Sequence, residues 1–102
     1  MKSLEDVQKQ LQAGSFEFTR HALRRAVERN ISEQEIKEAG AVVEVVEDYP
    51  EDKYSPSSLL LGVTQGERIL HIQVSRLASD KVKIITLYEP DKLQWIDYRK
   101  RR

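Results

Sequence analysis

The stretch RILHIQVSR, residues 68–76, decides the fold class because its side chains alternate between two environments. Leu70, Ile72 and Val74 share one side, while Ile69, His71, Gln73 and Ser75 share the other. A period of two predicts a β-strand that turns one apolar face toward a core.

Three further stretches favour strands, at residues 41–49, 58–65 and 81–89, and the first of them is rich in β-branched valine. Short turns at 66–67 and 78–81 separate the last three strands. Short connections of this kind imply antiparallel neighbours. The four stretches together predict a four-stranded, mainly antiparallel sheet.

The chain before residue 41 shows a helical period and predicts three helices, at 3–12, 19–30 and 32–40. Each begins at a hydroxyl side chain that can cap the first turn, namely Ser3, Thr19 and Ser32. The apolar stripe expected for the second helix consists of Ala22, Leu23, Ala26 and Val27. The link between the first two helices, SFEF, is expected to be short and extended.

Helices that precede the strands in sequence predict an α+β fold, with the N-terminal helices packed on one face of the sheet. We expect one domain over 1–102, with a core at about 16–98 and a basic tail at 99–102. The segment after Pro90 is expected to form one or two helical turns that dock on the body through Leu93, Trp95 and Ile96.

The composition favours a globular protein, since 39% of the 102 residues are hydrophobic and 33% are charged. The chain has no cysteine and no apolar run long enough for a bilayer, so we expect a cytoplasmic protein without a membrane partner. Seventeen basic and seventeen acidic residues cancel, which argues against a generic nucleic-acid coat.

The first candidate site lies on the second predicted helix, where His21, Arg25 and Arg29 follow one another at intervals of four residues. This spacing places all three on one edge of a helix. Arginine offers a donor fork suited to phosphate, and histidine can transfer a proton near neutral pH. The alternative is an ordinary charged helix edge, with the arginines paired to Glu28 or Asp48.

The second candidate is His71, in the middle of its strand. If the helices cover Leu70, Ile72 and Val74, His71 lies on the open face of the sheet. If Ile69 marks the covered face, His71 is a hydrogen-bonded core histidine.

The strand at 81–89 adds Thr86 and Tyr88, which strict alternation places on the same face as Val82 and Ile84. Tyr88 could position a phosphate or stack a base, or could be a core aromatic. Arg99, within the terminal RKRR, is a candidate for attracting phosphate.

Several kinds of site are not indicated by the sequence. Two histidines 50 residues apart are too few for a zinc site, so no metal is expected. The chain has no P-loop, no G-x-G-x-x-G and no G-x-S-x-G, so no cofactor is expected either.

The order of four segments is nevertheless distinctive: FTRHALRRAVERNIS (18–32), SPSSLLLGV (55–63), LHIQVS (70–75) and IITLYEPD (84–91) followed by Trp95. Over residues 16 to about 98, this pattern resembles a family of small bacterial domains named domain of unknown function 4258.

The layout of that family is similar to RelE/ParE/BrnT toxin-like folds, within a wider group that includes barnase-type ribonucleases. The resemblance implies a RelE-like fold and places His21, Arg25 and Arg29 at the site, with His71, Thr86 and Tyr88 less firmly there. It leaves Arg20 and Arg24 as surface charge. Toxins of the RelE type are usually strongly basic, whereas this chain is neutral.

The leading hypothesis is a toxin-like, metal-independent endoribonuclease with His21 as acid or base and the arginines on the phosphate. The alternative is a non-catalytic protein-interaction module that uses the open sheet face or the acidic stretch 44–52. The third hypothesis is a small-molecule site between the second helix and the sheet. The partners implied are RNA and a small antitoxin-like protein, and association of identical copies is compatible with either hypothesis.

Overall fold

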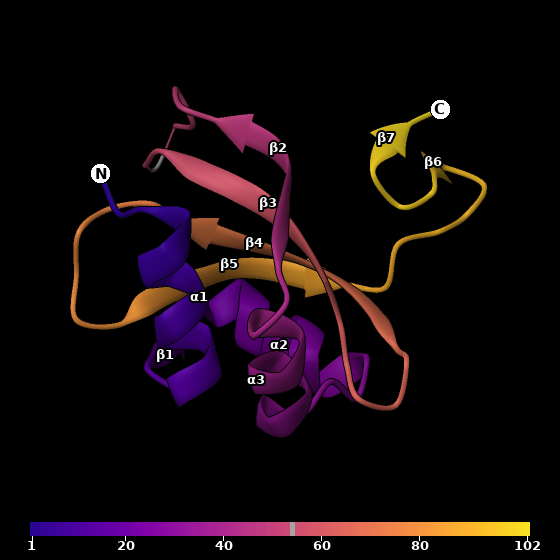
Figure 1. The fold of residues 1–102 in the computed structure, drawn as a ribbon, viewed down its shortest axis with the longest axis horizontal. Helices are drawn as coiled ribbons and strands as arrows, with labels where there is room; N and C mark the ends of the chain where they lie inside the picture. Colours follow the sequence, from indigo (N-terminus) through magenta and orange to yellow (C-terminus); the bar gives the residue numbers. More distant parts are fainter. Residues whose placement is uncertain (54) are drawn as a thin grey trace.

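Three helices cover one face of a five-stranded mixed sheet in the computed structural model, which describes residues 1–53 and 55–102 (Figure 1). The helices are α1 (Leu4–Ala13), α2 (Arg20–Glu28) and α3 (Glu33–Gly40). None of these helices, in the part of the chain that is described, is long and apolar enough to cross a bilayer.

The sheet follows the order β1-β5-β4-β3-β2. Its strands are β1 (Phe16–Phe18), β2 (Glu44–Tyr49), β3 (Ser57–Val63), β4 (Ile69–Ser75) and β5 (Val82–Tyr88). Strands β2 to β5 form an antiparallel meander, as predicted, and β1 joins β5 in parallel. A small separate sheet pairs β6 (Trp95–Ile96) with β7 (Lys100–Arg101).

The α+β class is confirmed, but the expected strand number of four is wrong. The link expected between the first two helices is strand β1, with Phe16 opposite Val82 and Phe18 opposite Ile84. Three residues are too few to show a period of two, and the partner strand lies far along the chain. Only the tertiary contact therefore makes this segment a strand.

The helix starts agree with the predicted caps, because capping depends on residues close in sequence. Ser3, Thr19 and Ser32 each accept a hydrogen bond from the backbone N–H three residues later. Glu35 completes the capping box by accepting from the Ser32 N–H at 3.0 Å. Gly14 ends α1 with φ 79°, a left-handed conformation that suits glycine.

The core lies between the helices and one face of the sheet. Leu60, Ile72 and Leu87 are fully buried neighbours across β3, β4 and β5. Val7 and Leu11 of α1 are buried in the same cluster, so the core includes residues before 16.

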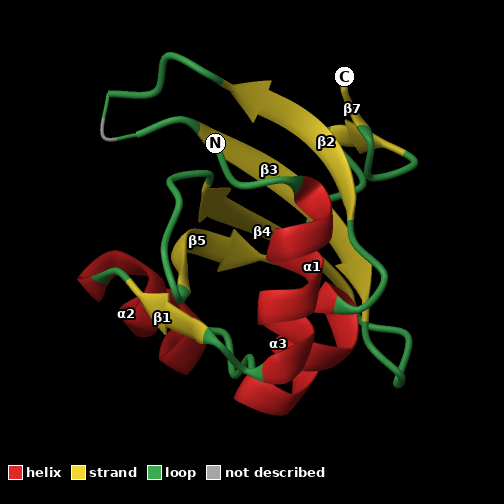
Figure 2. Ribbon diagram, turned by 60° about the vertical axis from the view of Figure 1, so that its left-hand side comes forward, coloured by secondary structure: helices red, strands yellow, loops and turns green. Residues whose placement is uncertain are grey.

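The expected apolar stripe of α2 is only half right. Ala22 and Ala26 are buried, but Leu23 is 52% exposed and Val27 is 73% exposed. Helix α2 lies along the β5 edge of the sheet rather than across its middle (Figure 2). Contact with an edge buries a narrow strip, and the small alanines let the helix approach closely.

A β-bulge corrects the predicted facing of β5. The register between β4 and β5 shifts at Gln73/Val74, so that Leu87 lies opposite Ile72 and Tyr88 opposite His71. Thr86 and Tyr88 therefore lie on the face opposite the helices. The prediction had placed them with Val82 and Ile84, because alternation carries no signal for an inserted residue.

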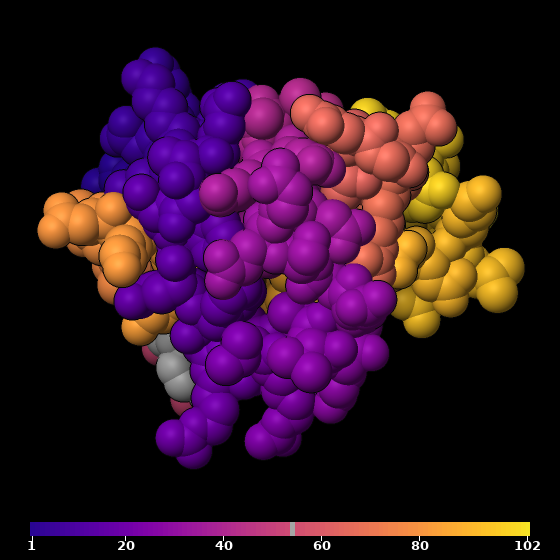
Figure 3. Space-filling model, turned by 90° about the horizontal axis from the view of Figure 1, so that it is seen from below, coloured from indigo at the N-terminus to yellow at the C-terminus, as the bar shows by residue number. Residues whose placement is uncertain are grey.

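The C-terminal segment forms the β6–β7 hairpin and not the expected helical turns. Trp95 docks as predicted and is 3% exposed, but Leu93 is 84% exposed and Ile96 is 41% exposed. Figure 1 shows this hairpin on the side of the sheet away from the helices, and Figure 3, seen from below, shows the yellow C-terminal segment at the margin of the helical face.

Candidate functional site

Helix α2 closes the free edge of β5. Strand β1 pairs with β5 only as far as Ile84, which leaves later carbonyl groups of β5 without a strand partner on that side. The Thr19 hydroxyl donates to the Ile85 carbonyl at 3.0 Å, and the Arg29 guanidinium donates to the Leu87 carbonyl at 2.8 Å. These bonds fix α2 against the sheet and protect an edge that could otherwise pair with another chain.

His21 is held at the sheet by Thr86. Its Nε2 atom lies 3.2 Å from the Thr86 hydroxyl, and the imidazole is exposed to solvent. The contact between a residue at the start of α2 and a residue of β5 brings together two of the predicted site residues. An exposed imidazole in a fixed orientation is available for proton transfer to a ligand.

His71 has a different environment. The helices cover Leu70, Ile72 and Val74, yet His71 is fully buried, because the hairpin covers the other face at this point. Its Nδ1 atom lies 3.2 Å from the Tyr88 hydroxyl, and its Nε2 atom donates to the Tyr98 carbonyl at 2.6 Å. Trp95 packs edge-on against the ring, with ring centroids 4.5 Å apart.

Burial lowers the pKa of the His71 imidazole, while the Tyr98 carbonyl and the carboxylate of Glu47 oppose this effect and Arg101 adds to it. Burial also raises the pKa of the Tyr88 phenol. His71 is therefore neutral in the fold, with one nitrogen as donor and the other as acceptor from Tyr88.

A stability titration checks this assignment. The pKa of His71 is lower in the folded than in the unfolded chain. The contribution of His71 to the free energy of unfolding is therefore full when the pH is above the ordinary pKa of 6.5, and it is lost as the pH falls below that value. We expect the free energy of unfolding to decrease from about pH 7 to about pH 5, and His71→Gln to flatten this decrease. If the free energy of unfolding of the variant decreases with the same slope against pH as that of wild type, His71 is not the group responsible. The carboxylates of Glu35 and Glu47 titrate lower, because their pKa values are also lowered.

Two predicted site residues are held elsewhere. Arg25 pairs with Glu28 of the same helix at 2.7 Å, which is the alternative that the sequence left open. Arg99 forms an ion pair with Glu44 of β2. Neither side chain lines the cavity that contains His21.

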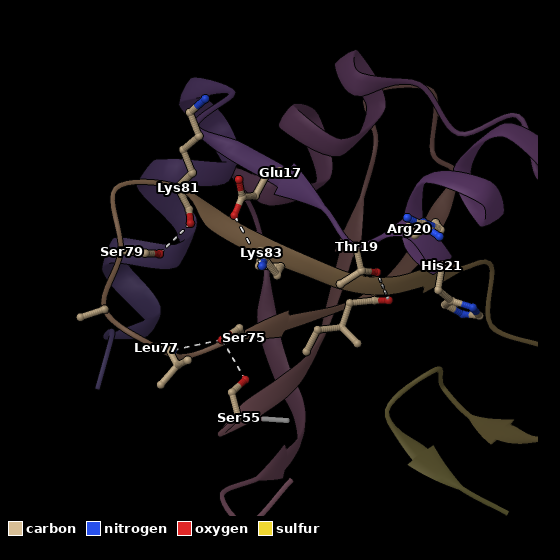
Figure 4. A pocket seen from close by; sticks show the side chains of 12 residues that line it. Glu17, Thr19, Arg20, His21, Ser55, Ser75, Leu77, Ser79, Lys81 and Lys83 are labelled. Atoms are coloured by element: carbon tan, nitrogen blue, oxygen red, sulfur yellow. Dashed lines mark hydrogen bonds and ion pairs between the residues drawn. The ribbon is translucent and has the colours of Figure 1, made fainter. Parts of the chain in front are cut away.

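That cavity is a cleft of about 840 Å³ on the face of the sheet away from the helices (Figure 4). One wall comes from β1 and the start of α2, and the other comes from the end of β4 and the loop before β5. The lining residues are Glu17, Thr19, Arg20, His21, Ser55, Ser75, Leu77, Ala78, Ser79, Lys81, Lys83 and Ile85.

Among the charged side chains that line the cleft, cations outnumber carboxylates. Arg20, Lys81 and Lys83 line it together with His21, and Glu17 is its one carboxylate among the described residues. Glu17 lies 3.8 Å from Lys83, and both side chains are about half exposed, so this pair is weak. Within residues 1–53 and 55–102, the side-chain cations of Arg20 and Lys81 have no ion-pair or hydrogen-bond partner.

Three cationic residues of this cleft were not among the predicted site residues. Arg20 was interpreted as surface charge, but it stands beside His21 at the cleft. Lys81 and Lys83 stand at alternate positions where β5 begins, a spacing that places two lysines on one face of a strand. That spacing was the signal in the sequence for a basic strand face. Only the position of α2 beside β5 shows that this face lines a cleft.

These features define a small α+β domain with a basic cleft, which the edge strand β1 and the start of α2 line on one side and the end of β4 with the loop before β5 lines on the other. The sequence pattern of the family described as "Domain of unknown function (DUF4258)" matches residues 18–89, which is more than half of the chain, so the protein belongs to this family. No curated protein matches the chain, and no solved structure matches it.

Proposed function

We propose that the protein binds RNA in the basic cleft and cleaves it without a metal ion, with His21 as the proton-transfer group. The observation that supports this function is the exposed imidazole of His21, fixed by Thr86 beside the unpartnered guanidinium of Arg20. A phosphodiester needs this combination, a cation for its charge and a base for the attacking oxygen.

The proposed reaction is an internal transesterification. His21 accepts the proton of a ribose 2′-hydroxyl, the 2′-oxygen forms a bond to phosphorus, and the bond from phosphorus to the 5′-oxygen breaks. The leaving 5′-oxygen takes a proton from solvent, which reaches the open cleft. Arg20, next to His21, stabilises the extra negative charge on the phosphate oxygens in the transition state. In this proposal Arg29 holds α2 at the edge of β5, and His71 and Tyr88 support the docked hairpin.

The test is incubation of the protein with mixed cellular RNA, with wild type compared to His21→Ala, Arg20→Ala and Arg24→Ala. Loss of the imidazole should reduce the cleavage rate by about 10²- to 10⁴-fold, the usual contribution of a general base. Arg24, which is exposed on the same helix and does not line the cleft, is the matched control and should cleave as wild type does. Fragmentation that is equal in all samples, or absent from wild type, would exclude this function.

A protein partner is the second candidate, and the exposed Leu23 and Val27 of α2 favour it, because they lie one turn apart on the outer surface. The surfaces expected for a partner from sequence are partly occupied within the chain. The hairpin covers part of the open sheet face, and Glu44 and Glu47 of the acidic stretch pair with Arg99 and Arg101. An antitoxin-like protein that binds α2 would leave the His21→Ala variant fully able to form the complex.

A further inference from the structure

We infer that the cleft binds a single-stranded polynucleotide along β5, contacting several successive phosphates, and not one isolated phosphate group. This inference rests on the proposed function for its ligand class and extends it to the length and form of the substrate. Figure 4 shows Lys81 where β5 begins, Lys83 further along the strand, and Arg20 and His21 on α2 at the other end of the cleft.

The spacing of these groups is the first argument. Lys81 and Lys83 stand two residues apart at the start of β5, and Thr86, which holds His21, follows three residues later. Two strand residues span about 6.6 Å, so the groups are spread over about 16 Å. Successive phosphates of an extended single strand are separated by a comparable step, whereas one phosphate can contact only one of these positions.

The opposite wall is the second argument, because it suits a sugar–phosphate backbone. Ser55, Ser75 and Ser79 line this wall with hydroxyl groups that are also hydrogen-bonded within the chain, and Leu77 adds apolar surface. Leu77 is 54% exposed, so its apolar surface is accessible to a ligand in the cleft. Backbone contacts of this kind recognise a strand by its charge and shape and read little of its sequence.

The distribution of charge resolves the conflict between a neutral protein and a polyanionic ligand. Arg25, Arg68, Arg76, Arg99 and Arg101 each form an ion pair with a carboxylate elsewhere in the molecule. Paired cations add little to the field at a distance, whereas among the described residues that line the cleft the cations outnumber the carboxylates. A net charge of zero is therefore compatible with a locally positive groove.

The experiment measures binding of fluorescent oligothymidylates of increasing length, from one nucleotide upward. Thymidylate lacks the 2′-hydroxyl, so the proposed cleavage cannot occur and binding is read by itself. Affinity should rise with each added phosphate and level off at about three or four nucleotides, the number that spans the cleft. The slope of log affinity against log salt should decrease by about 0.7 in Lys81→Ala and in Lys83→Ala.

Lys9→Ala is the matched control, because Lys9 is an exposed lysine of α1 that pairs with Glu5 and does not line the cleft. A mononucleotide that binds as tightly as the longer chains, or a salt slope that Lys81→Ala leaves unchanged, would overturn the inference. Length-dependent binding in a protein that fails to cut RNA would reject the proposed cleavage and keep the binding mode. Cutting of RNA without length-dependent binding would keep the proposed cleavage and reject the binding of several successive phosphates.

Discussion

Replacement of Trp95 by alanine is expected to lower the free energy of unfolding by about 3–5 kcal/mol, the usual cost of removing a large buried aromatic side chain. Trp95 is 3% exposed and fills the space between His71 and the guanidinium of Arg101, whose carbon lies 4.6 Å from the ring centroid. Without the indole, the hairpin loses its apolar contact with the sheet, and the ion pair of Arg101 with Glu47, which is partly exposed, offsets little of that loss.

Leu93→Ala serves as the control for this variant. Leu93 belongs to the same segment but is 84% exposed, so its truncation should change the free energy of unfolding by no more than about 0.5 kcal/mol. Urea denaturation followed by circular dichroism measures both variants. If Trp95→Ala and Leu93→Ala unfold at the same urea concentration, the hairpin does not contribute to the stability of the sheet.

The second large effect is expected at Gly62 of β3, where alanine should destabilise the fold by about 1–3 kcal/mol. A Cβ atom built at Gly62 would lie 2.4 Å from the Ala39 carbonyl oxygen and 2.9 Å from the Ala39 carbonyl carbon. Both are backbone atoms of α3, so the clash cannot be relieved by a side-chain rotation. The helix would have to move away from the sheet and open the core around Ile36.

Gly66→Ala is the matched substitution, since a Cβ atom there would meet nothing nearer than the Thr64 hydroxyl at 3.8 Å. We expect its denaturation midpoint to stay close to that of wild type, and that of Gly62→Ala to be clearly lower. Equal midpoints would mean that α3 tolerates a shift relative to β3, which contradicts the close packing described here.

The parts of the fold that were predicted from the sequence depend on neighbouring residues. The caps at Ser3, Thr19 and Ser32 act within one helical turn, and the meander follows from short turns between alternating strands. The parts that were missed depend on contacts between distant residues. Strand β1 exists through its pairing with β5, and the hairpin exists through the contact of Trp95 with His71.

The candidate site shows the same division. The sequence singled out His21 correctly as a residue of a helix start, and its link to Thr86 joins two residues of the family pattern. The family pattern placed Arg25 at the site and left Arg20 as surface charge, whereas Arg20 lines the cleft and Arg25 pairs with Glu28. Helical spacing orders residues around one helix, but it does not tell which edge meets the sheet.

The parallel pairing of β1 with β5 also determines the order in which the molecule can be assembled. Phe16 reaches its partner Val82 only after most of the chain has been synthesised, and contacts between such distant residues form slowly because a long loop must close first. The cleft is built from both sides of this closure, with β1 and the start of α2 on one wall and the end of β4 with the loop before β5 on the other. The newly made chain therefore carries all the residues of α2 long before the cleft can form.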